Sequence, residues 1–597
     1  MPVRKNEQGP RLWPVYVILA AALAALAWIW SPLDSPVGMS QTTLTLLVGL
    51  SSALLLLAWW LFFSRTRLFT RLAATLGLIA AAGTLNAVFE IRGLSGDLVP
   101  QVGWRRGATR LPAPPAAALP AVPPVLPGNS GSTSPQEAGA AHVGPPVIPR
   151  DSGSTGPEEP SATPVIPASS DSPGEEGSAG APASPSPAAS SARARSDNDF
   201  SQFLGPNRDA TLRGIGLARD WRSGSPVVLW RQPIGRGWSG FAVADGVAVT
   251  LEQRDGKEMV VAYDLERGSI RWSHGGGAGF ESVMAGDGPR ATPAIDQGRV
   301  YTLGVNGLLT ALDLASGRLL FEKDVLAENG ARRPEYGVAS SPLVVDGLVV
   351  VQAGGPGGHS LVAYDARTGE RRWSGGDDPA AYSSPRLATL GGVRQVVVLS
   401  LDSLAGHDVR TGAVLWRDPW PERAEKVSQP VVLGDDLVFV SVGYGVGGRL
   451  VKVSRSAGGT WHAELVWRTR QLKAKFTQVV AHRGFLYGLD EGVLVCLDPK
   501  DGERRWKSGR YGHGQVLLVD DLLLVQAEDG EVVLVEPVPE RHVELARFQA
   551  VEGRAWATPA LVGDLLLVRG DVEAACYRLP IEKGAVATVH PRLSGGK

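Results

Sequence analysis

The stretch AYDARTGERRW (Ala363–Trp373) contains the motif that decides the fold of the chain after residue 200. It begins on an apolar run, turns at Asp-x-x-Thr-Gly and ends on an aromatic residue. An aspartate side chain accepts backbone N–H groups a few residues on, and a glycine adopts a positive φ without steric cost. We therefore predict a hairpin between two strands. Further close copies begin at Ala262, Ala311, Gly406 and Cys496.

The position of the turn aspartate recurs every 38 to 52 residues, a spacing typical of the blades of a β-propeller. Two more apolar runs precede each hairpin, so each repeat supplies four strands. The eighth repeat lacks its outer strand, whereas VVLWRQPI (Val227–Ile234) has the sequence of one. We predict an all-β, eight-bladed β-propeller over residues 197–580, closed by pairing its first strand into the last blade. The turn position holds Asp264, Asp313, Asp365, Asp408, Ser454, Asp498, Glu536 and Arg578.

Aromatic residues close the outer strands once per blade. A single ligand cannot touch so many periodic sites, so this pattern predicts packing between blades. Cys496 and Cys576 occupy the same strand position in two blades that are not neighbours. They are predicted to be buried thiols, because a disulfide needs α-carbons within about 7 Å. The closing aromatics are Trp230, Trp272, Phe321, Trp373, Trp416, Trp467, Trp506 and Phe548.

The repeat A-x-D-x-x-T-G-x-x-x-W resembles that of pyrroloquinoline-quinone (PQQ)-like propellers. FSQFLGPNRDATL (Phe200–Leu212) is similar to the opening segment of bacterial PQQ-like repeat proteins. The resemblance implies a family that contains quinoprotein alcohol and glucose dehydrogenases. The same family contains non-enzymatic members, notably the propeller lipoprotein of the outer-membrane β-barrel assembly complex. It therefore indicates the fold and leaves the function open.

The dehydrogenase resemblance implies PQQ on the propeller axis against a tryptophan, with Ca²⁺ and a nearby aspartate base. The chain lacks the adjacent cysteine pair that many of these alcohol dehydrogenases carry, and it has no long inserted loops to build a substrate chamber. Most of its aspartates occupy hairpin turns. We therefore expect no catalytic residues, no metal site and no cofactor. The alternative is a PQQ- and calcium-dependent dehydrogenase that oxidises an alcohol or sugar and passes electrons to the membrane.

A binding site is predicted where the first strand of each blade begins, because these residues ring the mouth of the central channel. When the blades are aligned on their (Ser/Ala)-x-Pro signal, aromatic and basic residues gather in two adjacent columns. Such a face suits a peptide, a glycan or an anionic small molecule; alternatively, the rings only pack between blades. The predicted face comprises Trp238, Arg290, Tyr382, Lys426, Lys475, Phe476, His513 and Trp556.

Residues 1–106 are predicted to anchor the chain in a membrane. Apolar runs at 13–30, 43–63 and 72–89 are each long enough to cross a bilayer as a helix. The first run could instead be a signal-peptide core, but Trp28 and Trp30 stand where a cleavage site needs small residues. Basic residues place the N-terminus and the second loop in the cytoplasm: Arg4, Lys5, Arg11, Arg65, Arg67 and Arg71.

Three spans would export the propeller, so we predict a multi-pass protein of a bacterial inner membrane with a periplasmic propeller. Residues 107–196 are rich in Pro, Ala, Ser and Gly and are predicted to be a disordered linker that tethers the propeller without docking it. Residues 581–597 form a C-terminal tail. The net charge of −1 indicates no nucleic-acid partner. The expected function is non-catalytic binding or scaffolding of cell-envelope proteins or polymers.

Overall fold

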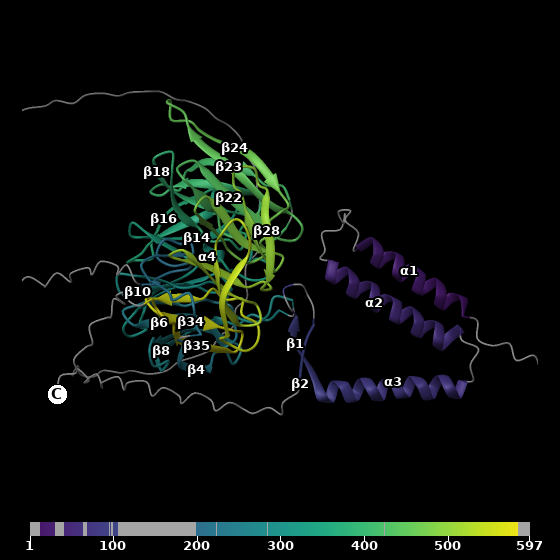
Figure 1. Ribbon diagram of the computed structural model, residues 1–597. Helices are drawn as coiled ribbons and strands as arrows, with labels where there is room; N and C mark the ends of the chain where they lie inside the picture. Colours follow the sequence, from purple (N-terminus) through teal and green to yellow (C-terminus); the bar gives the residue numbers. More distant parts are fainter. Residues whose placement is uncertain are drawn as a thin grey trace, which may run out of the picture. The chain divides into compact units, whose positions relative to one another are not determined.

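The computed structural model describes residues 12–29, 41–63, 68–94, 96, 100–104, 199–222, 224–282, 284–422 and 424–582. The predicted linker and most of the predicted C-terminal tail lie outside these residues. The described N-terminal part forms three helices and one hairpin (Figure 1). They are α1 (Trp13–Ile29), α2 (Gln41–Ala58) with the π-helical turn η1 (Trp59–Phe63), α3 (Leu68–Val88), and the antiparallel strands β1 (Phe89–Leu94) and β2 (Pro100–Trp104).

Each of the three predicted spans is helical, although their lengths differ from the prediction. Among the described residues, Phe69–Val88 is the one helix long and apolar enough to cross a membrane. Trp13–Ile29 and Leu47–Phe63 are shorter apolar helices. The third helix begins at Leu68 instead of residue 72, and residue 89, the predicted end of the span, already starts strand β1. The hairpin was not predicted from the sequence.

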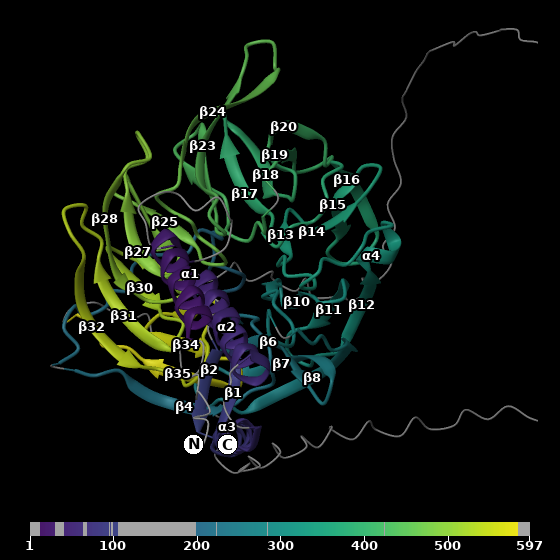
Figure 2. The same ribbon diagram turned by 90° about the vertical axis from the view of Figure 1, so that its right-hand side faces the viewer.

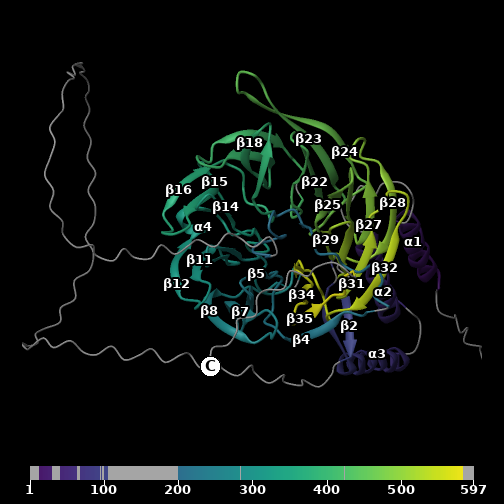
Figure 3. The same cartoon turned by 60° about the vertical axis from the view of Figure 1, so that its left-hand side comes forward.

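In the described part of the chain, eight sheets, each built on four antiparallel strands, follow one another around a common axis and form the predicted propeller (Figures 2 and 3). The first strands of neighbouring blades contact one another at the axis, and the fourth strands lie outermost. Blades one to four are β5 (Ala242–Ala244), β6 (Val247–Arg254), β7 (Lys257–Asp264), β8 (Ile270–Ala278); β9 (Ala294–Asp296), β10 (Arg299–Leu303), β11 (Leu308–Asp313), β12 (Leu319–Asp324); β13 (Leu343–Val345), β14 (Leu348–Gly355), β15 (His359–Asp365), β16 (Arg371–Gly375); β17 (Arg386–Leu390), β18 (Val393–Leu399), β19 (Ser403–Asp408) and β20 (Val414–Pro419). The short helix α4 (Val325–Glu328) follows β12.

The remaining blades continue the same order. They are β21 (Val431–Leu433), β22 (Leu437–Val442), β23 (Gly447–Arg455), β24 (Trp461–Thr469); β25 (Val479–His482), β26 (Phe485–Asp490), β27 (Val493–Leu497), β28 (Arg504–Arg510); β29 (Gln515–Val519), β30 (Leu522–Gln526), β31 (Glu531–Glu536), β32 (Val543–Gln549); and β33 (Ala560–Val562), β34 (Leu565–Arg569), β35 (Glu573–Arg578) with β4 (Val227–Pro233). Strand β3 (Thr211–Leu212) adds to the seventh sheet, parallel to β29.

Ring closure is confirmed, because β4 is the outer strand of the eighth blade. It pairs antiparallel with β35 and sets Trp230 opposite Cys576. The Arg231 guanidinium also donates a hydrogen bond of 2.7 Å to the Tyr577 hydroxyl. The first strand of the propeller thus completes the last blade and removes an edge that would otherwise be unpaired.

The tryptophans of the outer strands join neighbouring blades, as predicted. The Trp230 indole N–H donates to the Leu265 carbonyl at 2.8 Å, and Trp272 donates to Leu314 at 2.8 Å, in each case one residue after the turn aspartate of the next blade. The same indoles lie over the turn glycines. A β-carbon at Gly268 would lie 2.6 Å from the Trp230 ring. The aspartate, glycine and tryptophan of the repeat therefore form one contact between two blades.

Polar side chains hold the inner strands together around the axis. The Ser384 hydroxyl accepts the backbone N–H of Ser341 at 2.9 Å, and the Gln429 amide oxygen accepts that of Ser384 at 3.0 Å. The segment Phe200–Leu212 crosses this ring, and its buried Arg208 donates to the carbonyls of Ser341 and Pro342. Cys496 and Cys576 are buried free thiols, as predicted.

Candidate functional site

Four residues of the predicted face come together where the first strands of blades one, six, seven and eight begin. The Trp238 and Trp556 rings lie 4.6 Å apart, and Phe476 lies 5.0 Å from Trp556 and 5.1 Å from His513, measured between ring centroids. These distances are typical of favourable aromatic pairs. We call Trp238, Phe476, His513 and Trp556 the aromatic cluster.

Two charged residues that the sequence did not single out complete the aromatic cluster. The Arg554 guanidinium lies 5.1 Å from the Trp238 ring centroid and 5.0 Å from that of Trp556, within the range of cation–π contacts. The Glu528 carboxylate accepts the Trp556 indole N–H at 2.9 Å and the backbone N–H of His513 at 3.0 Å. Both charged side chains are buried. Both residues lie outside the two aligned columns. Arg554 is two residues before Trp556, and Glu528 lies in the turn after β30.

A residue of the N-terminal hairpin reaches this site. Gly96, in the turn between β1 and β2, donates its backbone N–H to Glu528 Oε1 at 2.6 Å. Its carbonyl accepts a hydrogen bond from the ammonium group of Lys475, which was predicted to lie on this face. The Lys475 ammonium also lies 4.9 Å from the centroid of the Tyr444 ring.

Arg290 adjoins the aromatic cluster, because it and Trp238 donate to the same carbonyl, that of Ala285, whereas Tyr382 and Lys426 have other partners. Tyr382 packs on Tyr336 with ring centroids 6.0 Å apart, and its hydroxyl accepts the Tyr336 backbone N–H at 3.2 Å. The Arg290 guanidinium donates to the carbonyls of three nearby residues and lies over the Phe280 ring. Lys426 is fully buried, and its ammonium donates to two backbone carbonyls. Burial lowers the pKa of Lys426.

A carboxylate lies on the Tyr382 side of the same face. Burial raises the pKa of Glu425, and the nearby negative charge of Glu335 raises it further. Burial likewise raises the pKa of Tyr382 to about 12. The Tyr382 hydroxyl therefore stays protonated and offers a hydrogen-bonding group, whereas a tyrosinate nucleophile or base would need a lowered pKa.

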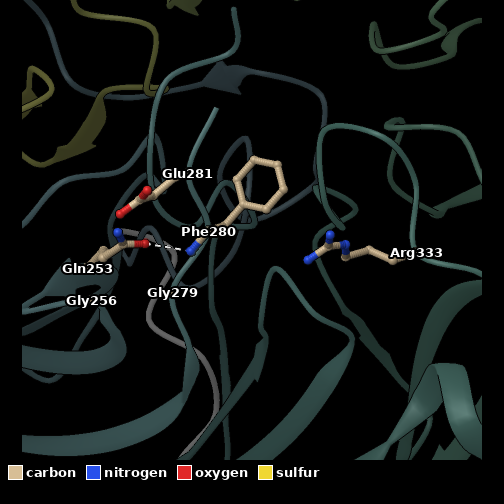
Figure 4. A pocket seen from close by; sticks show the side chains of 6 residues that line it. All are labelled: Gln253, Gly256, Gly279, Phe280, Glu281 and Arg333. Atoms are coloured by element: carbon tan, nitrogen blue, oxygen red, sulfur yellow. Dashed lines mark hydrogen bonds between the residues drawn. The ribbon is translucent and has the colours of Figure 1, made fainter. Parts of the chain in front are cut away.

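A separate pocket lies at the first blade. Gln253, Gly256, Gly279, Phe280, Glu281 and Arg333 line it (Figure 4). The Gln253 amide oxygen accepts the Phe280 backbone N–H at 2.7 Å and fixes the loop after β8. The Arg333 guanidinium lies 5.2 Å from the Phe280 ring centroid and donates to the Asn306 amide oxygen at 2.6 Å. The contacts of Gln253 and Arg333 are therefore parts of the fold.

The cofactor implied by the dehydrogenase resemblance, calcium-bound PQQ, would have to bind beside a tryptophan and several oxygen ligands. Calcium takes about 6–8 oxygen ligands, and among the described residues no group of three or more His, Cys, Asp or Glu side chains is arranged to hold a metal ion. At the aromatic cluster, the carboxylate of Glu528 already accepts N–H groups from Trp556, His513 and Gly96.

Comparisons with known proteins agree with the repeat motifs. Residues 257–508 match the family model described as outer membrane protein assembly factor BamB. The chain is similar to BamB of Bordetella pertussis, with 24% identity over 325 residues, covering 53% of this chain and 78% of that protein. It is also similar to the quinohemoprotein alcohol dehydrogenase ADH-IIG of Pseudomonas putida, with 32% identity over 130 residues, covering 21% of this chain and 16% of that protein.

Among solved structures, BamB from Moraxella catarrhalis matches with 15% identity and a TM-score of 0.44, over 60% of this chain and 99% of that one. The family-model match, residues 257–508, falls within the repeat region whose turns and tryptophans join the blades. The resemblance of this chain to the PQQ-like β-propeller family, which its repeat motifs indicated, is therefore confirmed.

Proposed function

We propose that this protein is a membrane-anchored, exported propeller that binds polypeptide segments of the cell envelope without catalysis. The observation that carries the proposal is the aromatic cluster with its acceptor Glu528 and its donor Lys475. An extended or turning backbone offers N–H and C=O groups at fixed spacing, and Gly96 shows that this pair accepts and donates to them. The aromatic rings supply apolar area beside the polar pair, a combination common in protein interfaces.

The envelope location is part of the same proposal. Helix α3 has the length and composition of a span, and we propose that α1 and the α2–η1 helix cross the membrane as well. The basic residues before α1 and between η1 and α3 then stay in the cytoplasm, which exports the propeller from the inner membrane. The name of the related BamB, a factor in the assembly of outer-membrane proteins, supports envelope polypeptides as partners.

Site-specific photo-crosslinking in the native membrane tests the binding site. A photoreactive amino acid at Phe476 should crosslink a defined polypeptide, whereas the same probe at Val466, exposed on the outer strand β24, should not. The crosslinked protein is then identified and purified for affinity measurements. Replacing Tyr382, Phe476 and Trp556 together with Ala should weaken its binding at least about 10-fold, which is about 1.4 kcal/mol. If a triple variant that still unfolds cooperatively binds as tightly as the wild type, the proposed site is not where this polypeptide binds.

The alternative is a PQQ-dependent dehydrogenase, which the similarity to the P. putida enzyme favours. The test is to add PQQ and Ca²⁺ to the purified full chain, then to measure bound-quinone absorbance and dye reduction with simple alcohols and aldoses. We expect neither signal. Stoichiometric quinone retention together with substrate-dependent dye reduction would establish the dehydrogenase.

A further inference from the structure

We propose that the aromatic cluster recognises glycine-centred turns, and that the turn of the chain's own β1–β2 hairpin occupies it until a partner's turn displaces it. This inference rests on the proposed function, because it takes polypeptides to be the ligands of the site. It adds the class of segment that binds and a competitor built into the chain. Three features of the Gly96 contact carry it.

The first feature is that the site binds both backbone groups of one residue, its N–H and its carbonyl. The N–H of Gly96 donates to Glu528 Oε1 at 2.6 Å, and the carbonyl of Gly96 accepts from the Lys475 ammonium. Hydrogen bonds to charged groups are about twice as strong as those between neutral groups. Because both bonds use main-chain atoms, the site does not require a particular side chain at the bound residue.

The second feature is that the site leaves no room for a side chain at that residue. A β-carbon on Gly96 would overlap Cδ2 of His513 and lie 2.5 Å from its Cγ. The His513 ring is 1% exposed and packs on Phe476, and its backbone N–H is held by Glu528. The ring therefore has little freedom to move aside, so the site selects glycine by exclusion.

The third feature is that two turns cannot bind at once. The Glu528 carboxylate accepts three N–H groups, and the Gly96 backbone lies against the His513 ring. A partner's glycine needs the same oxygen and the same space. A covalently linked segment acts at an effective concentration on the order of millimolar for a short flexible linker, and lower for a long one. The hairpin thus competes with any partner of moderate affinity.

A peptide added in trans tests self-occupancy. The probe is a fluorescein-labelled peptide with the sequence of residues 89–104, FEIRGLSGDLVPQVGW. The full chain in lipid nanodiscs should bind it weakly, and the Gly96→Val chain, whose own turn no longer fits, should bind it at least about 10-fold more tightly by fluorescence anisotropy. A probe with valine at the position of Gly96 is the matched control and should not bind either chain. Equal affinity of the two chains for the probe, or no binding to Gly96→Val, would overturn the proposal.

A second test exchanges side-chain size between Gly96 and His513, so that the proposal does not depend on a single variant. Hydrogen exchange of the hairpin amides should be slow in the wild type, faster in Gly96→Ala and slow again in Gly96→Ala/His513→Ala, which makes room for the added methyl group. Fast exchange in all three chains would contradict docking of the turn. The crosslink from Phe476 to an envelope polypeptide reports the proposed function separately. If that crosslink and its loss in the triple variant persist while the peptide fails to bind, self-occupancy is wrong and the binding function stands.

Discussion

At the scale of single residues, the repeat's turn glycine Gly412 meets two constraints, whereas Gly392, in the β17–β18 turn of the same blade, meets only one of them. Gly412 and Gly392 both have φ of +73°, where a side chain is strained. A β-carbon at Gly412 would also overlap the Trp373 ring of the preceding blade, whereas one at Gly392 would meet nothing within 4 Å. The motif that recurs within this chain therefore specifies a contact between blades as well as a hairpin turn.

The two glycines form a matched pair for measurement. Gly392→Ala should lower the free energy of unfolding by about 1–2 kcal/mol, the strain of a left-handed residue. Gly412→Ala should lower it by a further ~1–3 kcal/mol, because the methyl group overpacks the contact with Trp373. Urea denaturation of the two variants checks the difference. Equal losses would mean that the tryptophan contact adds nothing to the glycine requirement.

Glu258 on β7 predicts a pH dependence of stability. Burial raises its pKa from an ordinary value of 4.5 to about 7, although the Val305 backbone N–H donates to it. Between these pH values the folded protein keeps the proton and the unfolded chain has lost it, so stability falls as the pH rises through this window. The slope approaches about 1.4 kcal/mol per pH unit for one proton.

Glu258→Gln should remove this slope. Denaturation midpoints measured from pH 5 to 8 should fall with pH more steeply for the wild type than for the variant. Glu266→Gln, at an exposed position of the neighbouring turn, is the control and should follow the wild type. Parallel pH profiles for wild type and Glu258→Gln would show that Glu258 titrates near its ordinary pKa.

At the scale of elements, the blade repeat and the ring closure could be predicted because each strand carries its own local signal. Within a repeat such as Ala363–Trp373 the turn Asp, the turn Gly and the closing Trp lie within about ten residues of one another, and Val227–Ile234 carries the same apolar and tryptophan pattern. The aromatic cluster was predictable for the same reason, since each member precedes an inner strand. Glu528 and Gly96 were not, because their role arises from contacts made across 432 residues of sequence. No local pattern marks such a pair.

Because β4 closes the ring, we expect two residues of this strand to differ greatly in their contribution to stability. Trp230 is buried and joins two blades, so Trp230→Ala should destabilise the propeller by about 3–5 kcal/mol. Val228 is 51% exposed on the same strand, and Val228→Ala should change stability by no more than about 0.5 kcal/mol. Thermal and urea unfolding compare the two. A mild effect of Trp230→Ala would mean that the eighth blade does not depend on β4.

At the scale of the whole molecule, the arrangement of basic residues predicts the topology of the anchor. A reporter enzyme that is active only in the cytoplasm should be active when fused after Arg67 and inactive when fused after Arg105. An export-dependent reporter at the same two positions should give the opposite pattern. Activity of the cytoplasmic reporter after Arg105 would place the propeller inside the cell.

The pairing of β4 with β35 also determines when the ring can close during synthesis. Arg231 and its partner Tyr577 are 346 residues apart, so β4 stays without its partner until β35 has been synthesised. Contacts between distant residues form slowly, because a long loop must close before they contribute. During synthesis the growing ring therefore presents two open strand edges, one at β4 and one on whichever blade was completed last. Such edges can pair with other chains, and a chain interrupted before β35 leaves β4 without its partner.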